Sequence, residues 1–342
     1  MSETNRWADL IGNSHLRSWF SSGISRGRIG GSFLFVGPPG VGKQTVADLL
    51  ALTLMCKQSS PAEMSPCGTC EACVQVTART HPDVIRVEKP ADKSYLPLEL
   101  LIGRPEQRMQ EGFCRDIRLR PYNGKRKVAI LQDADFLNEE GANCLLKTLE
   151  EPPANSLIIL IGTSEQKQLP TIRSRCQIIR FAPLTTDESA QLVRQVHGVE
   201  ATDDAIAAAV TAAAGNMHTV LRQLSGESNE LREAVQNQLR VPHPDPVSLA
   251  RVITKYVEDA GKEASKRRNA MRDVFAIAVQ HFRHQMRSAV NETGVHPVTL
   301  ARLDRSIRAL HEVDRNANQA TLIECYACDI STGTTGNRGN IG

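Results

Sequence analysis

The sequence predicts an α/β fold, in which a parallel sheet with crossover helices is followed by a helical second half. A short apolar strand at residues 32–36 stops at a turn of glycines and prolines and leads into a helical stretch. Further apolar runs of strand length then alternate with helical stretches up to residue 181, which is typical of parallel strands joined by crossovers. Beyond Pro183 the strand pattern ends, and the chain becomes rich in Ala, Gln and Arg.

The elements of the first half follow from hydrophobic periodicity. Apolar residues at helical spacing predict a helix through residues 45–51. Spaced apolar residues among charges predict a surface helix over 98–116, although Gly103, Pro105 and Gly112 oppose it. The remaining strands are expected at residues 84–87, 128–131, 157–161 and 177–181.

A proline and an N-cap candidate, Thr185 or Thr186 with Glu188 close behind, predict the start of a helix after the last strand. We therefore expect four regions along the chain. They are an α/β core over 1–182, a small helical domain over 183–229, a longer helical domain over 230–330 and a disordered tail over 331–342. The tail is assigned to disorder because it has little apolar surface to bury.

Composition limits the function classes. The 342 residues are enough for two or three domains, and a hydrophobic content of 41% can form real cores. The net charge of +3 gives no global polyanion-binding character. Since there is neither an apolar run of membrane-spanning length nor a signal peptide, we expect a cytoplasmic protein without membrane contact. In that compartment the nine cysteines are expected to be reduced thiols or metal ligands.

Residues 37–45, GPPGVGKQT, nearly match the phosphate-binding loop G-x-x-x-x-G-K-[ST]. In such a loop backbone N–H groups and the positive end of the following helix bind phosphate, and the lysine reaches the terminal phosphates. Gln44 occupies the position of the Mg²⁺-binding hydroxyl, and Thr45 comes one residue late, about 100° around a helix. Binding of ATP and Mg²⁺ therefore stays open, and a glycine-rich turn without nucleotide is the alternative. The candidate residues are Gly37, Gly40, Gly42, Lys43, Gln44 and Thr45.

The strand at 128–131 should carry the second acidic motif. Hydrolysis needs an Asp that holds Mg²⁺ and then a Glu that orients the attacking water. Here Gln132 and Asp133 stand in those positions; shifted by one residue, Asp133 becomes the first acid and Ala134 follows it. In either register the chain lacks either the Asp that holds Mg²⁺ or the Glu that orients the attacking water. We expect slow or absent ATP hydrolysis, with binding without turnover left open by Lys43.

Four cysteines have the spacing of a metal site. Two overlapping C-x-x-C turns bring three thiolates together, Gly68 allows the tight turn, and a cysteine at a helix end supplies the fourth. A closed set of four sulfurs, with no position for water, is typical of structural Zn²⁺. An iron–sulfur cluster and free thiols are the alternatives. The predicted ligands are Cys56, Cys67, Cys70 and Cys73.

Arg175, preceded by Ser174, lies between the end of a predicted helix and a strand. An arginine held there on a rigid element could reach the γ-phosphate of a neighbouring subunit as an arginine finger. A solvated surface arginine is the alternative. Thr163, just past the strand at 157–161, is a candidate phosphate sensor or a simple turn residue.

Together these motifs resemble the AAA+ clamp-loader family, most closely its delta-prime subunits, over about residues 5–225. The resemblance rests on the order and spacing of several pieces: residues 9–12, 33–43, the four-cysteine insertion followed by THPD at 80–83, NCLLKTLEEPP at 143–153, and TIRSRC at 171–176. It implies an AAA+ core with a zinc insertion at about 56–73 and a helical lid over 183–229. Residues 230–330 would form an oligomerisation collar, and they match only in being helical.

The resemblance also implies a function. The chain would be a subunit of the DNA polymerase III holoenzyme, a DNA-directed DNA polymerase and hence nucleotidyltransferase complex. Its partners would be gamma/tau and delta subunits and, through the complex, the sliding clamp and primer-template DNA. In that family the Ser-Arg-Cys arginine acts in trans on ATP bound by the adjacent gamma/tau subunit, and Arg175 matches it.

Gln44 and Gln132 favour an ATPase-deficient subunit, because gamma/tau subunits would carry Lys-Ser/Thr in the loop and Asp-Glu on the strand. An active gamma/tau-type ATPase is the alternative, and a zinc-dependent DNA-binding protein with a relic loop is a more remote one.

Overall fold

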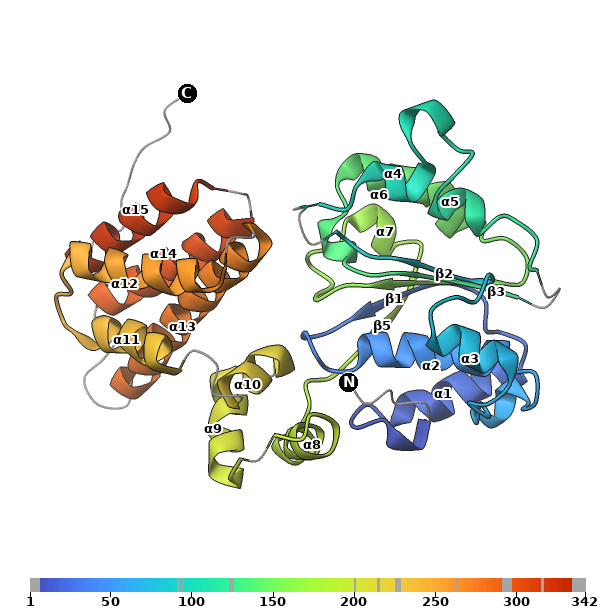
Figure 1. The fold of residues 1–342 in the computed structure, drawn as a ribbon, viewed down its shortest axis with the longest axis horizontal. Helices are drawn as coiled ribbons and strands as arrows, with labels where there is room; N and C mark the ends of the chain where they lie inside the picture. Colours follow the sequence, from blue (N-terminus) through green and yellow to red (C-terminus); the bar gives the residue numbers. More distant parts are fainter. Residues whose placement is uncertain are drawn as a thin grey trace. The chain divides into compact units, whose positions relative to one another are not determined.

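The computed structural model describes residues 7–90, 93, 95–122, 126–199, 201–213, 216–224, 229–261, 264–290, 297–314 and 317–333. The chain divides into two compact units, Met1–Ser225 and Gly226–Gly342. Figure 1 shows the sheet and its flanking helices in the first unit and a group of helices in the second. The predicted fold class is confirmed. The finer division of the first unit at residue 182 stays a prediction.

The first unit contains a five-stranded parallel sheet, and its strands lie where the sequence predicts them, to within a residue or two. The order across the sheet is β2-β3-β4-β1-β5, so the first strand lies between the fourth and the fifth. Parallel neighbours need crossover connections, which the helices supply. The strands are β1 Gly31–Val36, β2 Val84–Val87, β3 Lys127–Leu131, β4 Ser156–Ile161 and β5 Gln177–Arg180.

Helices cover both faces of this sheet (Figure 1). One face carries α1 His15–Ser25, α2 Lys43–Met55 and α3 Glu71–Thr77, and the other carries α4 Leu98–Ile102, α5 Phe113–Asp116, α6 Glu139–Glu150 and α7 Pro170–Arg173. Strand β1 contributes to both cores. Phe33 and Phe35 pack with α1 and α2, whereas Leu34 and Val36 pack with α4 to α6. The strand is therefore buried on both sides, as parallel α/β sheets require.

The single surface helix predicted over 98–116 is wrong. The structure has two short helices, α4 and α5, with a 3-10 turn at Pro105–Gln107 between them. Gly103 and Gly112 have φ of 84° and 91°. A Cβ on Gly112 would lie 2.8 Å from the backbone nitrogen of Gly103, so the chain folds tightly back on itself at these glycines. One continuous helix cannot form that contact.

In the described part of the first unit, three α-helices follow the sheet; they lie in the region predicted as a lid and are here called the lid helices. They begin at the predicted cap: the Glu188 N–H donates to the Thr185 hydroxyl at 3.2 Å, and the Thr185 N–H donates to the Glu188 carboxylate at 2.8 Å. Ile206 and Met217 on these helices belong to the same core cluster as Phe33. The helices are α8 Thr186–Gln191, continued by a π-helical turn at Leu192–Val196, α9 Asp203–Ala212 and α10 Met217–Leu224.

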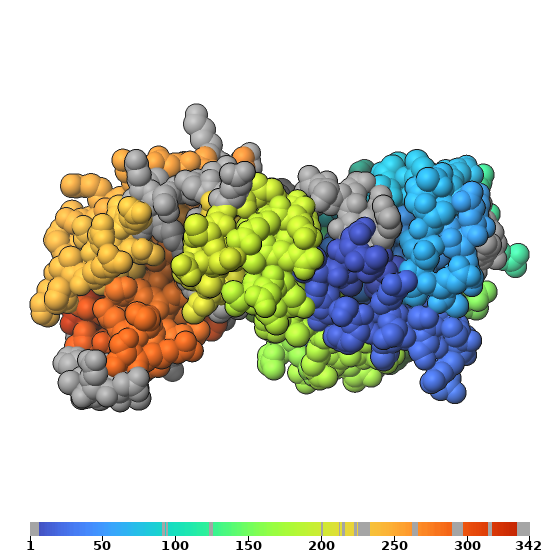
Figure 2. Space-filling model, turned by 90° about the horizontal axis from the view of Figure 1, so that it is seen from below, coloured from blue at the N-terminus to red at the C-terminus, as the bar shows by residue number. Residues whose placement is uncertain are grey.

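The start of the lid is tied to the amino-terminal part of the unit. The Asn13 side chain donates to the Ala182 carbonyl at 3.3 Å, and the Ala182 N–H donates back to Asn13 Oδ1 at 3.0 Å. Figure 2 looks onto this face and shows the lid segment, in yellow-green, beside the N-terminal segment, in dark blue. The lid helices therefore belong to the same compact unit as the sheet.

The second unit is helical in the residues that the structure describes. Tyr326 is fully buried at its centre, with its ring 4.7 Å from that of Phe275 and its hydroxyl hydrogen-bonded to Ser306 at 3.0 Å. The last helix ends at Thr332 with Gly333 as its C-cap, so it includes the first two residues of the predicted tail. The helices are α11 Asn229–Arg240, α12 Pro246–Asp259, α13 Ala264–Val290, α14 Pro297–Asp314 and α15 Gln319–Thr332.

Most of the predicted disordered tail, residues 334–342, lies outside the described residues. Within the described part of the chain, no helix combines the length and apolar character needed to cross a membrane.

Leu160 of β4 tests the packing of the sheet because its side chain is fully buried. Leu160→Ala should lower the free energy of unfolding of the first unit by about 2–5 kcal/mol, since it removes buried contacts and leaves a cavity. The matched control is Leu119→Ala, where the side chain is 43% exposed and the change should stay within about 0.5 kcal/mol. Urea denaturation followed by Trp7 and Trp19 fluorescence measures both; equal losses would contradict the described packing.

Candidate functional site

The candidate phosphate-binding loop runs from the end of β1 to the start of α2 and is enclosed by two other elements. Gly37 and Gly40 have φ of 153° and 81°. A Cβ on Gly37 would lie 2.6 Å from the Phe181 carbonyl oxygen, and one on Gly40 would lie 2.6 Å from the Met217 Cβ. The Met217 N–H also donates to the Pro39 carbonyl at 3.2 Å. Only glycine fits these backbone angles and close approaches, so the loop is held between the end of β5 and the lid helix α10.

Lys43 is buried within this loop. It follows Gly42, whose φ is 91°, and its ammonium donates to the carbonyl oxygens of Gly37 and Pro38, both at 2.6 Å. Burial lowers the pKa of Lys43 to about 8, and attraction to Asp135 opposes that shift. Near neutral pH the side chain is therefore still mainly a cation, and it is bound by the loop's own backbone.

Gln44 is hydrogen-bonded along its own helix. Its side-chain amide donates to Asp48 at 3.0 Å, and Asp48 forms an ion pair with Arg86 of β2 at 2.8 Å. Among the described residues, neither Gln44 Oε1 nor Arg86 Nη1 has a hydrogen-bond partner, although both atoms are buried. Thr45 is half-buried at the next position. The position expected for a Mg²⁺-binding hydroxyl thus carries an amide tied to an aspartate–arginine pair.

The second acidic motif follows β3, which ends at Leu131. Gln132 stands in the first acidic position, and Asp133 follows it with φ of 57°. The Lys89 N–H donates to Asp133 Oδ2 at 3.3 Å. Burial nevertheless raises the pKa of Asp133, because desolvation outweighs the contacts with Lys89. The motif therefore offers one amide and one carboxylate whose charged form is disfavoured.

Asp135, which the sequence analysis missed, binds the candidate sensor Thr163. The Thr163 N–H donates to the two carboxylate oxygens of Asp135 at 3.0 and 2.9 Å, and its hydroxyl donates to the same carboxylate. The side chain of Gln168, which is 4% exposed, donates to Asp135 as well. The sequence signal that could have identified Asp135 is its place as the second Asp of the segment QDAD, soon after the end of a strand. Asp135 connects the end of β3 to the end of β4.

Arg175 contacts acceptors of its own chain through all three guanidinium nitrogens. Nε and Nη2 both contact Glu150, the last residue of α6. Nη1 donates to the Thr171 carbonyl at 2.9 Å and to the Ser174 hydroxyl at 3.1 Å. The Arg175 side chain is 27% exposed, so it is partly accessible to solvent.

The backbone on both sides of Arg175 is anchored in the core. Ile172, three residues earlier, is 1% exposed, and Cys176 packs against the same core cluster. Burial raises the pKa of the Cys176 thiol to about 12, so this cysteine is a neutral packing residue. Arg175 therefore extends from a rigid turn between α7 and β5.

The four predicted cysteine ligands come together between α2 and α3. Their sulfur atoms all lie within 4.8 Å of one another, with Cys56 and Cys67 at 3.6 Å and Cys67 and Cys73 at 4.0 Å. Four sulfurs bound tetrahedrally at about 2.3 Å from one ion would be about 3.8 Å apart. The cluster of Cys56, Cys67, Cys70 and Cys73 therefore has the chemistry and the spacing of a tetrathiolate metal site.

The turn around Cys67 stabilises negative charge on sulfur. Backbone N–H groups of Cys70 and Thr69 lower the pKa of the Cys67 thiol to about 6. Burial raises the pKa of Cys73 instead, and neighbouring sulfurs add to that effect. A cation at the centre of the cluster would favour the thiolate form of both residues.

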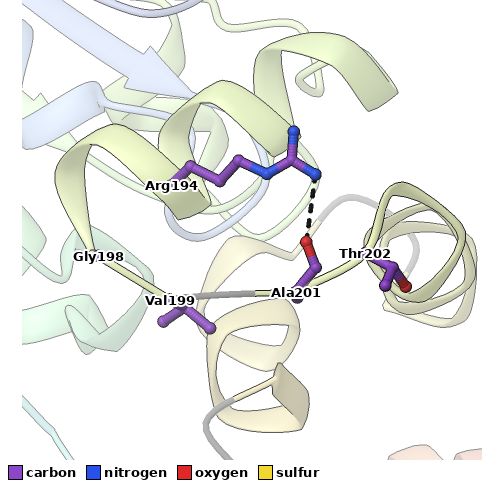
Figure 3. Close-up of a pocket in the computed structure, with 5 residues that line it drawn as sticks. All are labelled: Arg194, Gly198, Val199, Ala201 and Thr202. Atoms are coloured by element: carbon purple, nitrogen blue, oxygen red, sulfur yellow. Dashed lines mark hydrogen bonds between the residues drawn. The ribbon is translucent and has the colours of Figure 1, made fainter.

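A hollow of about 690 Å³ in the lid region lies apart from these sites (Figure 3). Arg194 reaches across it, but its guanidinium donates to the Ala201 carbonyl at 3.1 Å and pairs with Asp203 at 2.6 Å. The lining residues include none from the phosphate-binding loop, the cysteine cluster or the turn of Arg175. They are Arg194, Gly198, Val199, Ala201 and Thr202.

Known proteins resemble this chain in sequence. The family described as "DNA polymerase III, delta subunit" matches residues 12–185, half of the chain. DNA polymerase III subunit tau of Salmonella typhimurium is 33% identical over 53% of this chain and 26% of its own length. The delta' subunit of Pseudomonas aeruginosa is 35% identical over 42% of this chain and 41% of its own length. The delta' subunit of Escherichia coli is 32% identical over 62% of this chain and 60% of its own length. The chain thus spans less than two thirds of each of these relatives.

Solved structures resemble the fold at low sequence identity. A gamma subunit-related protein of Thermotoga maritima has a TM-score of 0.43 and 14% identity, over 92% of this chain and 98% of its own. A single-residue variant of RuvB from Thermotoga maritima has a TM-score of 0.42 and 15% identity, over 88% of each chain.

The parallel sheet with β1 between β4 and β5, the glycine loop after β1 and the helices that follow define an α/β module of the AAA+ class. The sequence match is more specific than the class. The chain belongs to the DNA polymerase III delta subunit family, through the match over residues 12–185. The predicted resemblance to clamp-loader subunits is confirmed.

Proposed function

We propose that this chain is a delta-prime-type subunit of a replicative sliding-clamp loader. It hydrolyses ATP poorly or not at all, and it supplies Arg175 in trans to ATP bound by a neighbouring ATPase subunit. Its partners are gamma/tau-type and delta-type subunits and, through the complex, the sliding clamp and primer-template DNA. Residues 183–229 serve as the lid and residues 230–330 as the oligomerisation collar. The chain works in the cytoplasm.

The observation that carries the ATPase-deficient part of this proposal is the hydrogen bonding of Gln44. Catalysis of phosphoryl transfer depends on a metal held by the loop hydroxyl and the strand carboxylate. Gln44 instead donates to Asp48, which pairs with Arg86, and Gln132 stands in place of the strand carboxylate. Both protein ligands for Mg²⁺ are therefore replaced by amides.

Family membership and local geometry support the role of Arg175. Its backbone is anchored by Ile172 and Cys176, while its guanidinium lies at the surface. A planar guanidinium with several donors suits the oxygens of a γ-phosphate better than a lysine ammonium does. Ser174 acts together with Arg175, because its hydroxyl accepts a hydrogen bond from the guanidinium and helps to orient it.

For the cysteine cluster we propose one structural Zn²⁺. Four thiolates leave no coordination position for water, so the ion would stabilise the fold and would not act on a substrate. The cluster joins the end of α2 at Cys56 to the start of α3 at Cys70 and Cys73, and Cys56 and Cys73 are buried in the core of the unit. Zinc would thus stabilise the attachment of α3 to the sheet.

The isolated chain should show no appreciable ATP turnover, because both metal ligands are amides. Gln44→Ser combined with Gln132→Asp should restore Mg²⁺-dependent nucleotide binding, measured by titration calorimetry. Turnover should stay low even then, since Asp133 is shorter than the usual Glu. Hydrolysis by the unmodified chain at about 1 s⁻¹ or faster would instead support an active gamma/tau-type ATPase.

Arg175→Ala should lower DNA-stimulated ATP hydrolysis and clamp loading in a complex reconstituted with the partner ATPase, the clamp and primed DNA. A trans arginine contributes roughly 10³-fold or more at its own site, and other active sites dilute the loss in a bulk assay. Arg175→Lys should rescue little. Arg173→Ala, at the last residue of the preceding helix α7, is the matched control. A complex that contains Arg175→Ala and loads clamps at the unmodified rate would show that Arg175 is an ordinary surface residue.

Metal analysis of protein purified without chelator should give about one Zn per chain. Cys70→Ser should lose the metal and destabilise the first unit, whereas Cys325→Ser, at an exposed cysteine of α15, should do neither. The metal should dissociate on acidification, because protons compete with it for the four sulfurs. Metal content near zero, or iron in place of zinc, would refute the assignment.

A further inference from the structure

The guanidinium of Arg175 is engaged by a carboxylate of its own chain. The Glu150 carboxylate contacts Nε and Nη2 of the guanidinium. Nη1 donates hydrogen bonds to the Thr171 carbonyl and the Ser174 hydroxyl. A guanidinium has five N–H donors, so most of them are already used. A phosphate in a neighbouring subunit therefore meets an arginine whose charge is neutralised and whose strongest hydrogen bonds are made elsewhere.

The position of Glu150 in its helix gives a second, independent observation. Glu150 is the last residue of α6, and Glu151 is its C-cap. A carboxylate at the C-terminus of a helix faces the negative end of the helix dipole, which is unfavourable. Glu150 offsets this cost by pairing with Arg175. Glu151 has the same charge at the same helix end, is exposed, and makes no ion pair with any described residue.

The two elements that carry this pair are packed together. Leu145 and Leu149 of α6 and Ile172 of α7 belong to one core cluster and are almost completely buried. The backbones under Glu150 and Arg175 are therefore fixed with respect to each other, while the side chains are 48% and 27% exposed. Exchange of partners needs only side-chain rotation, and an ion pair at this exposure is weak enough to be exchanged.

We infer that Glu150 is a positioning residue that retains Arg175 on its own subunit until a γ-phosphate replaces it. This inference rests on the proposed function. In the unengaged state the Arg175–Glu150 pair is neutral and contributes little to phosphate binding. When the neighbouring ATP site approaches, the phosphate, with its larger negative charge, takes the guanidinium, and Glu150 returns to solvent. The pair thus lowers ATP hydrolysis in assemblies that are not yet arranged for clamp loading.

The test is Glu150→Gln in the reconstituted complex, because Gln has the same shape but cannot form the ion pair. ATP hydrolysis by the adjacent site without DNA should rise by about two- to fivefold, the range expected from loss of an exposed ion pair. The rise should be in kcat with KM for ATP unchanged, since Glu150 does not contact ATP in this scheme. It should disappear in the double variant Glu150→Gln with Arg175→Ala.

Glu151→Gln is the matched control and should leave the rate without DNA unchanged. An unchanged or lower rate for Glu150→Gln, while Arg175→Ala still lowers DNA-stimulated hydrolysis, would overturn the inference and leave the proposed function standing. A rise that persists in the double variant would also overturn it. If Arg175→Ala has no effect at all in the complex, the proposed trans role and this inference are both wrong.

Discussion

Burial of β1 on both faces is the constraint that positions the other parts of the first unit. Phe33 and Phe35 pack toward α1 and α2, and Leu34 and Val36 pack toward the opposite helices. A strand fixed in this way can neither shift nor turn over, because a slip of one residue would exchange its two sets of side chains. The loop that follows β1 therefore starts from a fixed point, and the elements that enclose it pack against the same core.

The polar residues near this loop form bonds within the chain where a nucleotide site would use them on a ligand. Lys43 binds loop carbonyls, Gln44 binds Asp48, and Thr163 binds Asp135. Buried polar groups need partners whether or not a ligand is present. These contacts within the chain give the same side chains a structural role that does not depend on turnover.

The sequence predicted well what depends on local pattern. Apolar runs located the strands, because strands buried on both faces need uninterrupted apolar residues, and the C-x2-C-x2-C spacing located a cluster that one turn builds. The prediction of one helix over residues 98–116 failed, because two glycines with positive φ bring separate parts of the backbone together there. The pairing of Arg175 with Glu150, 25 residues away, depends on how two helices pack, and spacing along the chain does not encode that.

The paired hydrogen bonds between Asn13 and Ala182 connect residues 169 positions apart. They bring the first and last segments of the α/β module together, just before the lid helices begin. Asn13 therefore helps to hold the start of the segment after β5 against the module, although the two lie far apart along the chain. Loss of the Asn13 side chain would accordingly remove this connection, while the hydrogen bonds between the strands of the sheet stay in place.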